Sequence, residues 1–357
     1  MKRILLVTYY FGNSGAVGAK RLNDLYAFLS KRYKSVIVSY KKSATENYIQ
    51  KNNKRNKSKL SIGRCFRSLD KTILGFAWIK EFFQVIRKED RIDVVIASYK
   101  PSWSILIGIV FAKYYRAKLI LEYRDLASLF GRKKKIFVLH QLDKIIDTIL
   151  VNMADEVVVV SPTQKRLIKK ISKKPVTIIT NGFNEVIENN KPLNNKTLQL
   201  IYAGTLSEYR NLKSVYEFCC KHFKNFILKV ASQTNPKLEY LNFDNVIYLG
   251  YIGSEKLKEE YLKADYFILL EGSGEESAEN IPAKFFEYLS YKKPILADVY
   301  PHSDIQNIMD EINCGFNIKS KNEFSNNYTY NNALDRYSRT AQFEKYIDLI
   351  ETNIKNG

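Results

Sequence analysis

The feature that most constrains the fold is a regular alternation of short Val- and Ile-rich runs with longer amphipathic segments. Such alternation predicts parallel strands joined by helices, because parallel strands need long crossover connections. The expected strands of the first half are Arg3–Tyr9, Ser35–Ser39, Asp93–Ser98, Lys118–Tyr123, Glu156–Ser161 and Val176–Thr180. Those of the second half are Leu198–Ala203, Phe226–Ala231, Val246–Leu249, Asp265–Leu270, Pro294–Ala297 and Gly315–Ile318.

The stretches between these runs repeat apolar residues with the helical period and therefore predict helices. The expected helices include Gly18–Lys31, Leu69–Arg87, Ser102–Tyr115, Leu139–Met153, Thr163–Ile171, Asn211–His222, Ser254–Ala264, Ala283–Ser290 and Thr340–Asn353. The polar stretch Asn184–Lys196 separates the two halves and is interpreted as a linker. The sequence thus predicts an α/β protein with two doubly wound domains, residues 1–190 and 191–338, that face each other across a cleft.

The excess of positive over negative charge is confined to the first half of the chain. Residues 1–190 contain 37 Lys and Arg against 15 Asp and Glu, a net charge of +22, whereas the remainder has a net charge of −2. A Lys- and Asn-rich composition alone would not leave the second half balanced. The asymmetry predicts an anionic partner for the first domain, either a membrane surface or a nucleic acid.

A membrane surface is the favoured partner. Lys51–Lys59 holds five cations, but no nucleic-acid recognition motif or aromatic platform accompanies it. The aromatic and lysine-rich segment Leu69–Arg87 is expected to insert at the interface. The alternative is that its aromatic residues pack in the core and Lys51–Lys59 alone carries the attraction. Because no signal peptide or run long enough to span a bilayer is visible, we expect a cytoplasmic protein held peripherally at the inner face of the membrane.

The sequence gives no support to metal or nucleophilic chemistry. No Ser-His-Asp or Cys-His set is apparent. The cysteines and histidines lack the spacing of a zinc site or a disulfide framework; they are Cys65, Cys219, Cys220, Cys314, His140, His222 and His302. We therefore expect no metal and no cofactor.

Two carboxylates stand eight positions apart in the stretch Glu279-Asn280-Ile281-Pro282-Ala283-Lys284-Phe285-Phe286-Glu287. The stretch follows one expected strand and precedes another, which places both carboxylates at the carboxyl edge of a parallel sheet, where open α/β folds bind ligands. Carboxylates accept hydrogen bonds from hydroxyls, and backbone N–H groups near a helix start bind phosphate. A nucleotide sugar carries both groups. The alternative makes Glu279 a solvated loop residue and Glu287 an exposed helix residue.

This stretch resembles the E-x7-E signature of retaining glycosyltransferases of family 4, and the context E-x-x-P-x-K-x-x-E-Y followed by K-P-I-L-A strengthens the resemblance. The resemblance implies the GT-B fold, two Rossmann-like domains facing a cleft, with residues 339–357 packing back on the first domain. It assigns Glu279 to the donor-sugar hydroxyls and Glu287 to the ribose. It also implies that Asn280, Ile281 and Pro282 line the donor site.

A glycine-rich loop, Phe11–Gly18, follows the first expected strand. Gly12, Ser14 and Gly15 would let backbone N–H groups approach phosphate closely, and the loop resembles the first glycine-rich loop of family 4. Its glycines do not match the dinucleotide fingerprint G-x-G-x-x-G. A simple strand-to-helix turn is the alternative.

A second loop begins at Gly204, after the first strand of the second half. Family 4 often has Arg directly after this glycine and Lys five residues later; here Thr205 and Arg210 occupy those places. A guanidinium binds phosphate bidentately, so Arg210 is the favoured ligand of the donor diphosphate. Lys284 is the candidate for a second cation, with an ordinary surface position as its alternative.

The segment Glu122–Leu126 follows a strand in the first half. Arg124 and Asp125 resemble an R-D-L element of family members with lipid-linked acceptors, so the two residues are expected at the acceptor. A local ion pair and turn is the alternative. Asn181-Gly182 resembles the turn that closes the first domain of the family and is carried over only as a fold marker.

The resemblance implies a metal-independent glycosyltransferase that moves a sugar from a UDP- or GDP-linked donor to a lipid-linked or oligosaccharide acceptor in bacterial surface polysaccharide synthesis. Glu279, Arg210 and Lys284 are the expected catalytic residues. Two alternatives stay open: a sugar-nucleotide 2-epimerase of the same fold, and a basic nucleic-acid-binding protein. The second explains the charge but not the glutamate pair.

Overall fold

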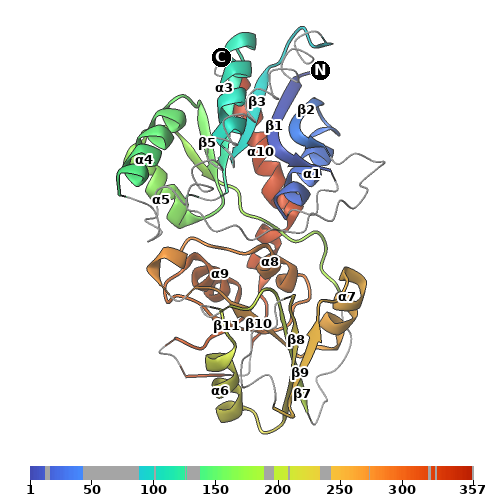
Figure 1. The fold of residues 1–357 in the computed structure, drawn as a ribbon. Helices are drawn as coiled ribbons and strands as arrows, with labels where there is room; N and C mark the ends of the chain where they lie inside the picture. Colours follow the sequence, from blue (N-terminus) through green and yellow to red (C-terminus); the bar gives the residue numbers. More distant parts are fainter. Residues whose placement is uncertain are drawn as a thin grey trace, which may run out of the picture.

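The computed structural model contains two parallel sheets, one above the other, with helices on both faces of each (Figure 1). The structure describes residues 1–12, 17–42, 88–99, 102–124, 126, 137–188, 197–207, 210–233, 243–272, 274–320, 323–325 and 328–355. The segments Lys51–Lys59 and Leu69–Arg87, on which the membrane prediction drew, lie outside these residues.

The first sheet has six parallel strands in the order β2-β1-β3-β4-β5-β6. Their bounds are β1 Arg3–Phe11, β2 Lys34–Lys42, β3 Val94–Tyr99, β4 Lys118–Tyr123, β5 Glu156–Val159 and β6 Val176–Ile178. The helices α3 Ser102–Tyr115, α4 Phe137–Asn152 and α5 Pro162–Ile171 pack on one face. The other face carries α1 Val17–Leu29 and, from the far end of the chain, α10 Arg339–Lys355.

The second sheet also has six parallel strands, in the order β12-β11-β10-β7-β8-β9. Their bounds are β7 Leu198–Ala203, β8 Phe226–Ala231, β9 Val246–Gly250, β10 Tyr266–Leu270, β11 Ile295–Asp298 and β12 Gly315–Asn317. On one face lie α7 Ser254–Lys263, α8 Ala283–Leu289 and α9 Asp304–Ile312; α6 Lys213–His222 covers the other. Two short 3-10 turns, η2 Glu275–Ser277 and η3 Asn332–Tyr337, complete the domain.

All twelve expected strands form, with ends that differ by at most a few residues. One difference has a clear cause. The strand expected to reach Ser161 ends at Val159, because the Ser161 side chain caps α5 by accepting a hydrogen bond from the Gln164 N–H and Pro162 starts the helix. The α9 helix fills the gap between β11 and β12, where the alternation predicts a helix without giving its bounds.

The chain crosses between the domains twice, after β6 and before α10, and the two crossings are hydrogen-bonded to each other. The Phe183 N–H donates to the Tyr337 carbonyl over 3.2 Å, and the Arg339 N–H donates to the Phe183 carbonyl over 2.7 Å. Gly182 lies against this pairing: a Cβ there would be 2.8 Å from backbone atoms of Arg339. The crossings therefore form one narrow, paired connection.

A second contact joins the domains at the start of α5. Asp304, at the first position of α9, accepts hydrogen bonds from the Thr163 N–H at 3.0 Å and the Thr163 hydroxyl at 3.1 Å. Both residues are buried. The domains are thus held together beside the cleft as well as at the crossings.

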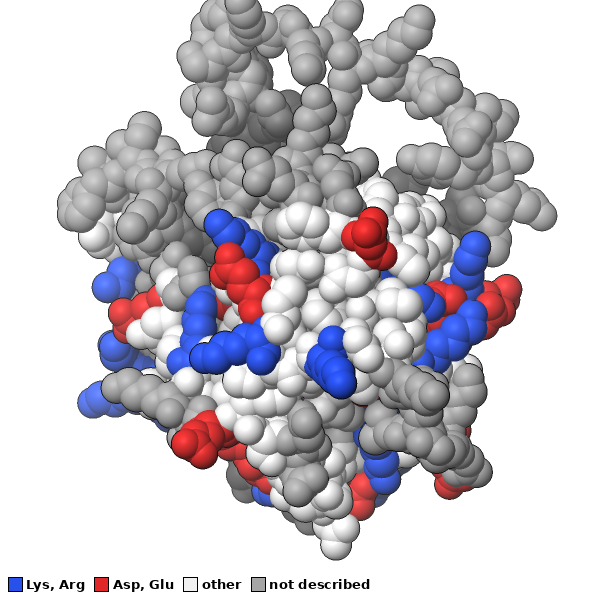
Figure 2. Space-filling view, turned by 90° about the horizontal axis from the view of Figure 1, so that it is seen from below, with Lys and Arg blue, Asp and Glu red and all other residues white. Residues whose placement is uncertain are grey.

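Charge is mixed on the second domain. Viewed from the end that carries α6, Lys and Arg side chains lie interspersed with Asp and Glu and with uncharged residues (Figure 2). This agrees with the balanced charge of the second half of the sequence. In the part of the chain that is described, no helix is long and apolar enough to span a bilayer.

Candidate nucleotide-sugar site

The carboxyl ends of both sheets open onto the space between the domains. A cavity of about 1020 Å³ lies there, lined from the first domain by residues such as Gly12, Lys20 and Asn181 and from the second by α8. A smaller cavity of about 340 Å³ adjoins the ends of β7, β8 and β9 in the second domain. Ligand sites in parallel α/β sheets occur at such edges.

Lys284 and Glu287 line both cavities. They stand three residues apart on α8 and therefore face the same side of the helix. A ligand that extends from one cavity to the other would meet a cation and a carboxylate at the junction.

Glu287 is an exposed residue of α8, as the alternative predicted, but its exposed side lines both cavities and has both domains around it. Burial raises its pKa, and the positive charges of Lys20 and Lys258 act in the opposite direction. The two charges that lower the pKa of Glu287 come from different domains, since Lys20 belongs to α1 and Lys258 to α7.

Lys284 lies in a confined place. Its Nζ is 4.8 Å from the centre of the Tyr202 ring, a cation–π geometry. Burial lowers its pKa to about 8; nearby Glu271 works against this shift, and Arg210 adds to it. Gly204 makes the packing possible, because a Cβ there would lie 3.2 Å from Lys284 Nζ and the backbone φ is +153°. The ordinary surface position considered for Lys284 is therefore wrong.

Arg210 is paired with a residue that the sequence reasoning missed. Its Nη2 lies 2.7 Å from Oε2 of Glu271, which directly follows β10 and is buried. Arg210, Glu271 and Lys284 thus form one charged cluster at the strand ends. A carboxylate immediately after a buried strand was the available signal for Glu271.

Glu279 is placed differently from Glu287. It follows η2, is only 1% exposed, and lines neither cavity. The interpretation of Glu279 as a solvated loop residue is thus wrong, and its contact with a donor sugar stays a prediction. The neighbouring Asn280, Ile281 and Pro282 also do not line the cavities; the Asn280 N–H donates to the Ser277 carbonyl at 3.0 Å.

On the first domain, Gly12 lines the interdomain cavity and has a φ of +75°, which favours glycine. Its N–H donates to the Asn23 side chain at 2.9 Å, and the Asn23 amide donates back to its carbonyl at 3.1 Å. The loop is therefore tied to α1. Ser14 and Gly15 lie outside the described residues.

Of the two residues predicted to lie at the acceptor, the structure describes Arg124; Asp125 is outside the described residues. Arg124 Nε lies 3.9 Å from Oε2 of Glu122, and burial lowers the pKa of Arg124. Glu122 itself accepts hydrogen bonds from Arg21, Ser98 and Tyr346, with donor–acceptor distances of 2.9, 2.6 and 2.7 Å. The local ion pair considered as an alternative for Arg124 is therefore present, at the long distance of 3.9 Å.

Among the described residues there is no group of three or more His, Cys, Asp or Glu side chains that could hold a metal ion. The geometry offers instead a polar junction for a ligand that has both hydroxyls and negative charge.

No family model matches the sequence, and no curated protein sequence matches it. Solved structures do. Sucrose-phosphate synthase from Thermosynechococcus elongatus is similar over 100% of both chains, with a TM-score of 0.65 and 13% identity. A glycosyltransferase from Rickettsia africae is similar over 100% of both chains, with a TM-score of 0.59 and 14% identity. The Anabaena protein HepE, solved with UDP-glucose, has a TM-score of 0.54 at 12% identity over 99% of this chain and 100% of its own.

The chain has the GT-B fold. The fold prediction is confirmed: two Rossmann-like domains with parallel sheets face a cleft. In a GT-B fold the cavities described above lie where the carboxyl ends of the two sheets meet, and Lys284 and Glu287 stand at their junction.

Proposed function

We propose that the protein is a retaining, metal-independent glycosyltransferase of family 4 type, which transfers a sugar from a UDP- or GDP-linked donor to a lipid-linked glycan acceptor. The observation that carries this proposal is the pair Lys284 and Glu287 at the junction of the two cavities. The UDP-glucose bound by the similar protein HepE supports a nucleotide-sugar ligand.

The smaller cavity is the proposed binding site of the nucleotide's base. Its wall is formed by small or apolar residues at strand ends, among them Ala203, Ala231 and Ile252. Glu287, at its mouth, would accept hydrogen bonds from the ribose hydroxyls. The diphosphate and the sugar would then extend along α8 into the interdomain cavity.

Catalysis in this arrangement is electrostatic. As the bond between sugar and diphosphate breaks, positive charge develops on the sugar and negative charge on the departing phosphate oxygen. Lys284 and Arg210 would stabilise the negative charge, and preorganised charges of this kind are usually the largest contribution to catalysis. The donor phosphate would take the acceptor proton, and Glu279 is the proposed contact of the sugar hydroxyls.

The first domain is the proposed acceptor domain, resting on the inner face of an anionic membrane. Its net charge of +22 supports this place. So do apolar side chains that face solvent on α3, where Leu106, Val110 and Tyr114 repeat every four residues. A bacterial surface polysaccharide is the proposed product of the pathway.

The test incubates the purified protein with UDP- and GDP-sugars, with and without a polyprenyl-diphosphate-linked sugar. The proposal expects release of nucleoside diphosphate and a glycosylated lipid whose anomeric configuration, read by NMR, matches the donor. Conversion of the donor without acceptor would indicate the 2-epimerase instead. Binding of nucleic acid, with no affinity for any nucleoside diphosphate, would overturn the proposal.

A further inference from the structure

Three lysines line the interdomain cavity without forming an ion pair to any residue that the structure describes: Lys20, Lys258 and Lys284. The other cations on its wall are already neutralised. Arg21 is paired with Glu122, and Arg339 with Asp24. The lysines are therefore the charges that an anionic ligand in this cavity would meet first.

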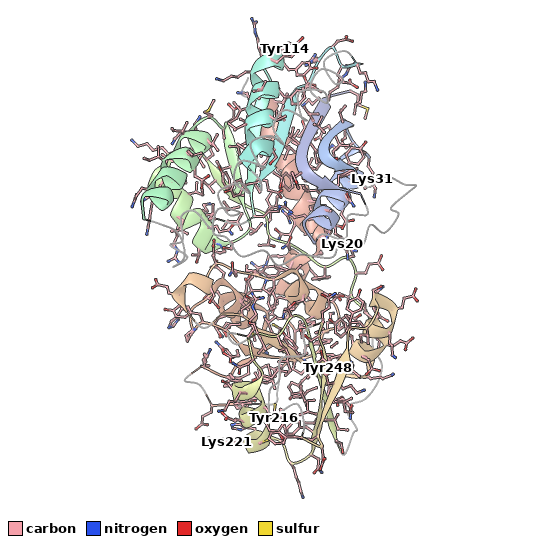
Figure 3. The ribbon with its side chains drawn as sticks, in the orientation of Figure 1. Lys20, Lys31, Tyr114, Tyr216, Lys221 and Tyr248 are labelled. Atoms are coloured by element: carbon pink, nitrogen blue, oxygen red, sulfur yellow. The ribbon has the colours of Figure 1, made fainter. Side chains whose placement is uncertain are left out.

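Lys20 differs from the other two because it comes from the opposite domain. It lies in the first turn and a half of α1, and its side chain is exposed at the end of the first domain that faces the second (Figure 3). Lys20 and Glu287 line the same cavity from opposite domains. In agreement with that placement, the positive charge of Lys20 counteracts the rise in the pKa that burial imposes on the Glu287 carboxyl. A ligand held by Glu287 would thus lie within reach of Lys20.

The chemistry of a nucleotide fixes which part of the ligand would meet Lys20. The ribose carries its phosphates on the 5′ oxygen, so when Glu287 binds the ribose hydroxyls, the diphosphate begins about one ribose ring away from that carboxylate, within the same cavity. On the second domain, one of the two cations expected after Gly204 is missing. Thr205 offers no charge, and Arg210 is partly neutralised by Glu271, 2.7 Å away. Lys258 and Lys284 are then the cations of that wall without an ion pair to a described residue.

We propose that Lys20 supplies, from the first domain, a further cation that binds the diphosphate of the nucleotide donor from the side opposite Lys284. This inference rests on the proposed function, and it adds a residue that closes the diphosphate site across the domain boundary. A ligand held by Lys20 on one side and by Lys284 and Glu287 on the other links the two domains directly. A cation that contacts the departing diphosphate also stabilises charge that grows toward the transition state.

The experiment measures the affinities of UDP, GDP and ADP, and of the corresponding monophosphates and nucleosides, by calorimetry. The proteins are the wild type, Lys20→Ala, Lys20→Arg and Lys31→Ala. Lys31 is a matched control, an exposed lysine two residues beyond the other end of α1 and away from the cleft (Figure 3). Thermal melting checks that each variant folds.

Lys20→Ala is expected to weaken binding of the diphosphate about tenfold to a hundredfold and to leave nucleoside affinity unchanged, with Lys20→Arg restoring most of the loss. Lys31→Ala should bind like the wild type. Equal diphosphate affinity in Lys20→Ala and wild type would overturn the inference while leaving the proposed function intact. An equal loss for nucleoside and diphosphate would overturn it too, since Lys20 would then act on the cavity shape. A wild type that binds none of the diphosphates would instead overturn the proposed function.

Discussion

Arg21 of α1 and Glu122 of β4, 101 positions apart in the sequence, form an ion pair of 2.9 Å in the interior of the first domain. Arg21 is 5% exposed and Glu122 fully buried. The guanidinium also donates to the carbonyls of Ile179 and Thr180, and Tyr346 of α10 donates to the carboxylate. One buried charge pair thus joins α1, β4, the end of the first sheet and the last helix.

Removing one member of this pair should be costly, because the other would remain charged in the interior. Glu122→Gln is expected to lower the free energy of unfolding by about 3–5 kcal/mol. Lys2→Gln, which removes a partly exposed pair with Glu351 and leaves the Tyr33 hydrogen bond to that carboxylate in place, should cost about 1 kcal/mol or less. Chemical denaturation of the three proteins compares these values; similar small losses in both variants would contradict the prediction.

The same ion pair predicts that its contribution to the stability of the fold is lost at acidic pH. Arg21 and its other neighbours lower the pKa of Glu122 from its usual 4.5 to about 2, although burial alone would raise it. Because the folded-state pKa is the lower one, the stabilisation is fully present above pH 4.5 and is lost as the pH falls toward 2. The stability difference between wild type and Glu122→Gln should therefore shrink below pH 4.5, measured by denaturation at a series of pH values.

The lowered pKa of Lys284 predicts that ligand binding weakens at alkaline pH. Since burial lowers its pKa to about 8, the free protein loses this charge as the pH rises through that value. Nucleoside diphosphate affinity should fall between pH 7 and 9, and binding near pH 8 should take up a proton, seen as a heat that varies with the buffer. Lys284→Arg keeps its charge in this range and should show neither effect. Uptake that persists in this variant would assign the proton to another group.

Glu287 is expected to bind ribose hydroxyls, with charged hydrogen bonds worth about 1.5–3 kcal/mol. Glu287→Ala should weaken nucleoside diphosphate binding about tenfold to a hundredfold. The 2′-deoxy form of the ligand provides the matched control: it should bind the wild type more weakly, and the variant should discriminate less between the two forms. Undiminished discrimination by the variant would place the ribose elsewhere.

Gly182→Ala tests the paired crossings. A Cβ at this position would meet backbone atoms of Arg339 and Tyr337 at 2.8 Å, so the two segments must separate. We expect a loss of about 1–3 kcal/mol in unfolding free energy. Gly253→Ala, where a Cβ would meet nothing within 4 Å, should cost less, about 1 kcal/mol at most, because its effect is limited to the N-cap of α7. Thermal and chemical unfolding of the two variants would contradict the prediction if their losses were equal.

The proposed membrane face of α3 can be tested by flotation with liposomes. Val110→Ser changes a side chain that is 47% exposed and should reduce binding to anionic liposomes without lowering the melting temperature. Phe243→Ser, at a similarly exposed site of the second domain, should leave binding unchanged. Binding that is equal for neutral and anionic liposomes and insensitive to salt would exclude the electrostatic account.

Much of the fold was predictable because buried parallel strands leave continuous apolar runs, and every strand of both sheets was located in this way. The alternation predicts a helix between β11 and β12 but not the bounds of α9, although its cap is visible in the sequence: the Ser303 hydroxyl accepts a hydrogen bond from the Gln306 N–H. The order of the strands, which sets the faces covered by α1 and α10, depends on contacts far apart in the chain.

The site was predictable where it is local and not where it depends on tertiary contacts. Lys284 and Glu287 share one helix, so their spacing already placed them together. Glu271 meets Arg210 only through the pairing of distant strands, and the polar surroundings of Glu279 gave no sign that it is buried. That burial accompanies a contact with α9, where the Asp304 N–H donates to the Ala278 carbonyl at 2.8 Å.

The position of α10 has a consequence for how the molecule is made. This helix covers one face of the first sheet, packing Phe343, Tyr346 and Ile347 against α1 and the strands. The first domain is therefore not one continuous stretch of chain, and a fragment ending at the linker would leave that face bare. During translation, one face of the sheet that is synthesised first would stay partly uncovered until α10 leaves the ribosome, so the second domain has its full set of elements before the first.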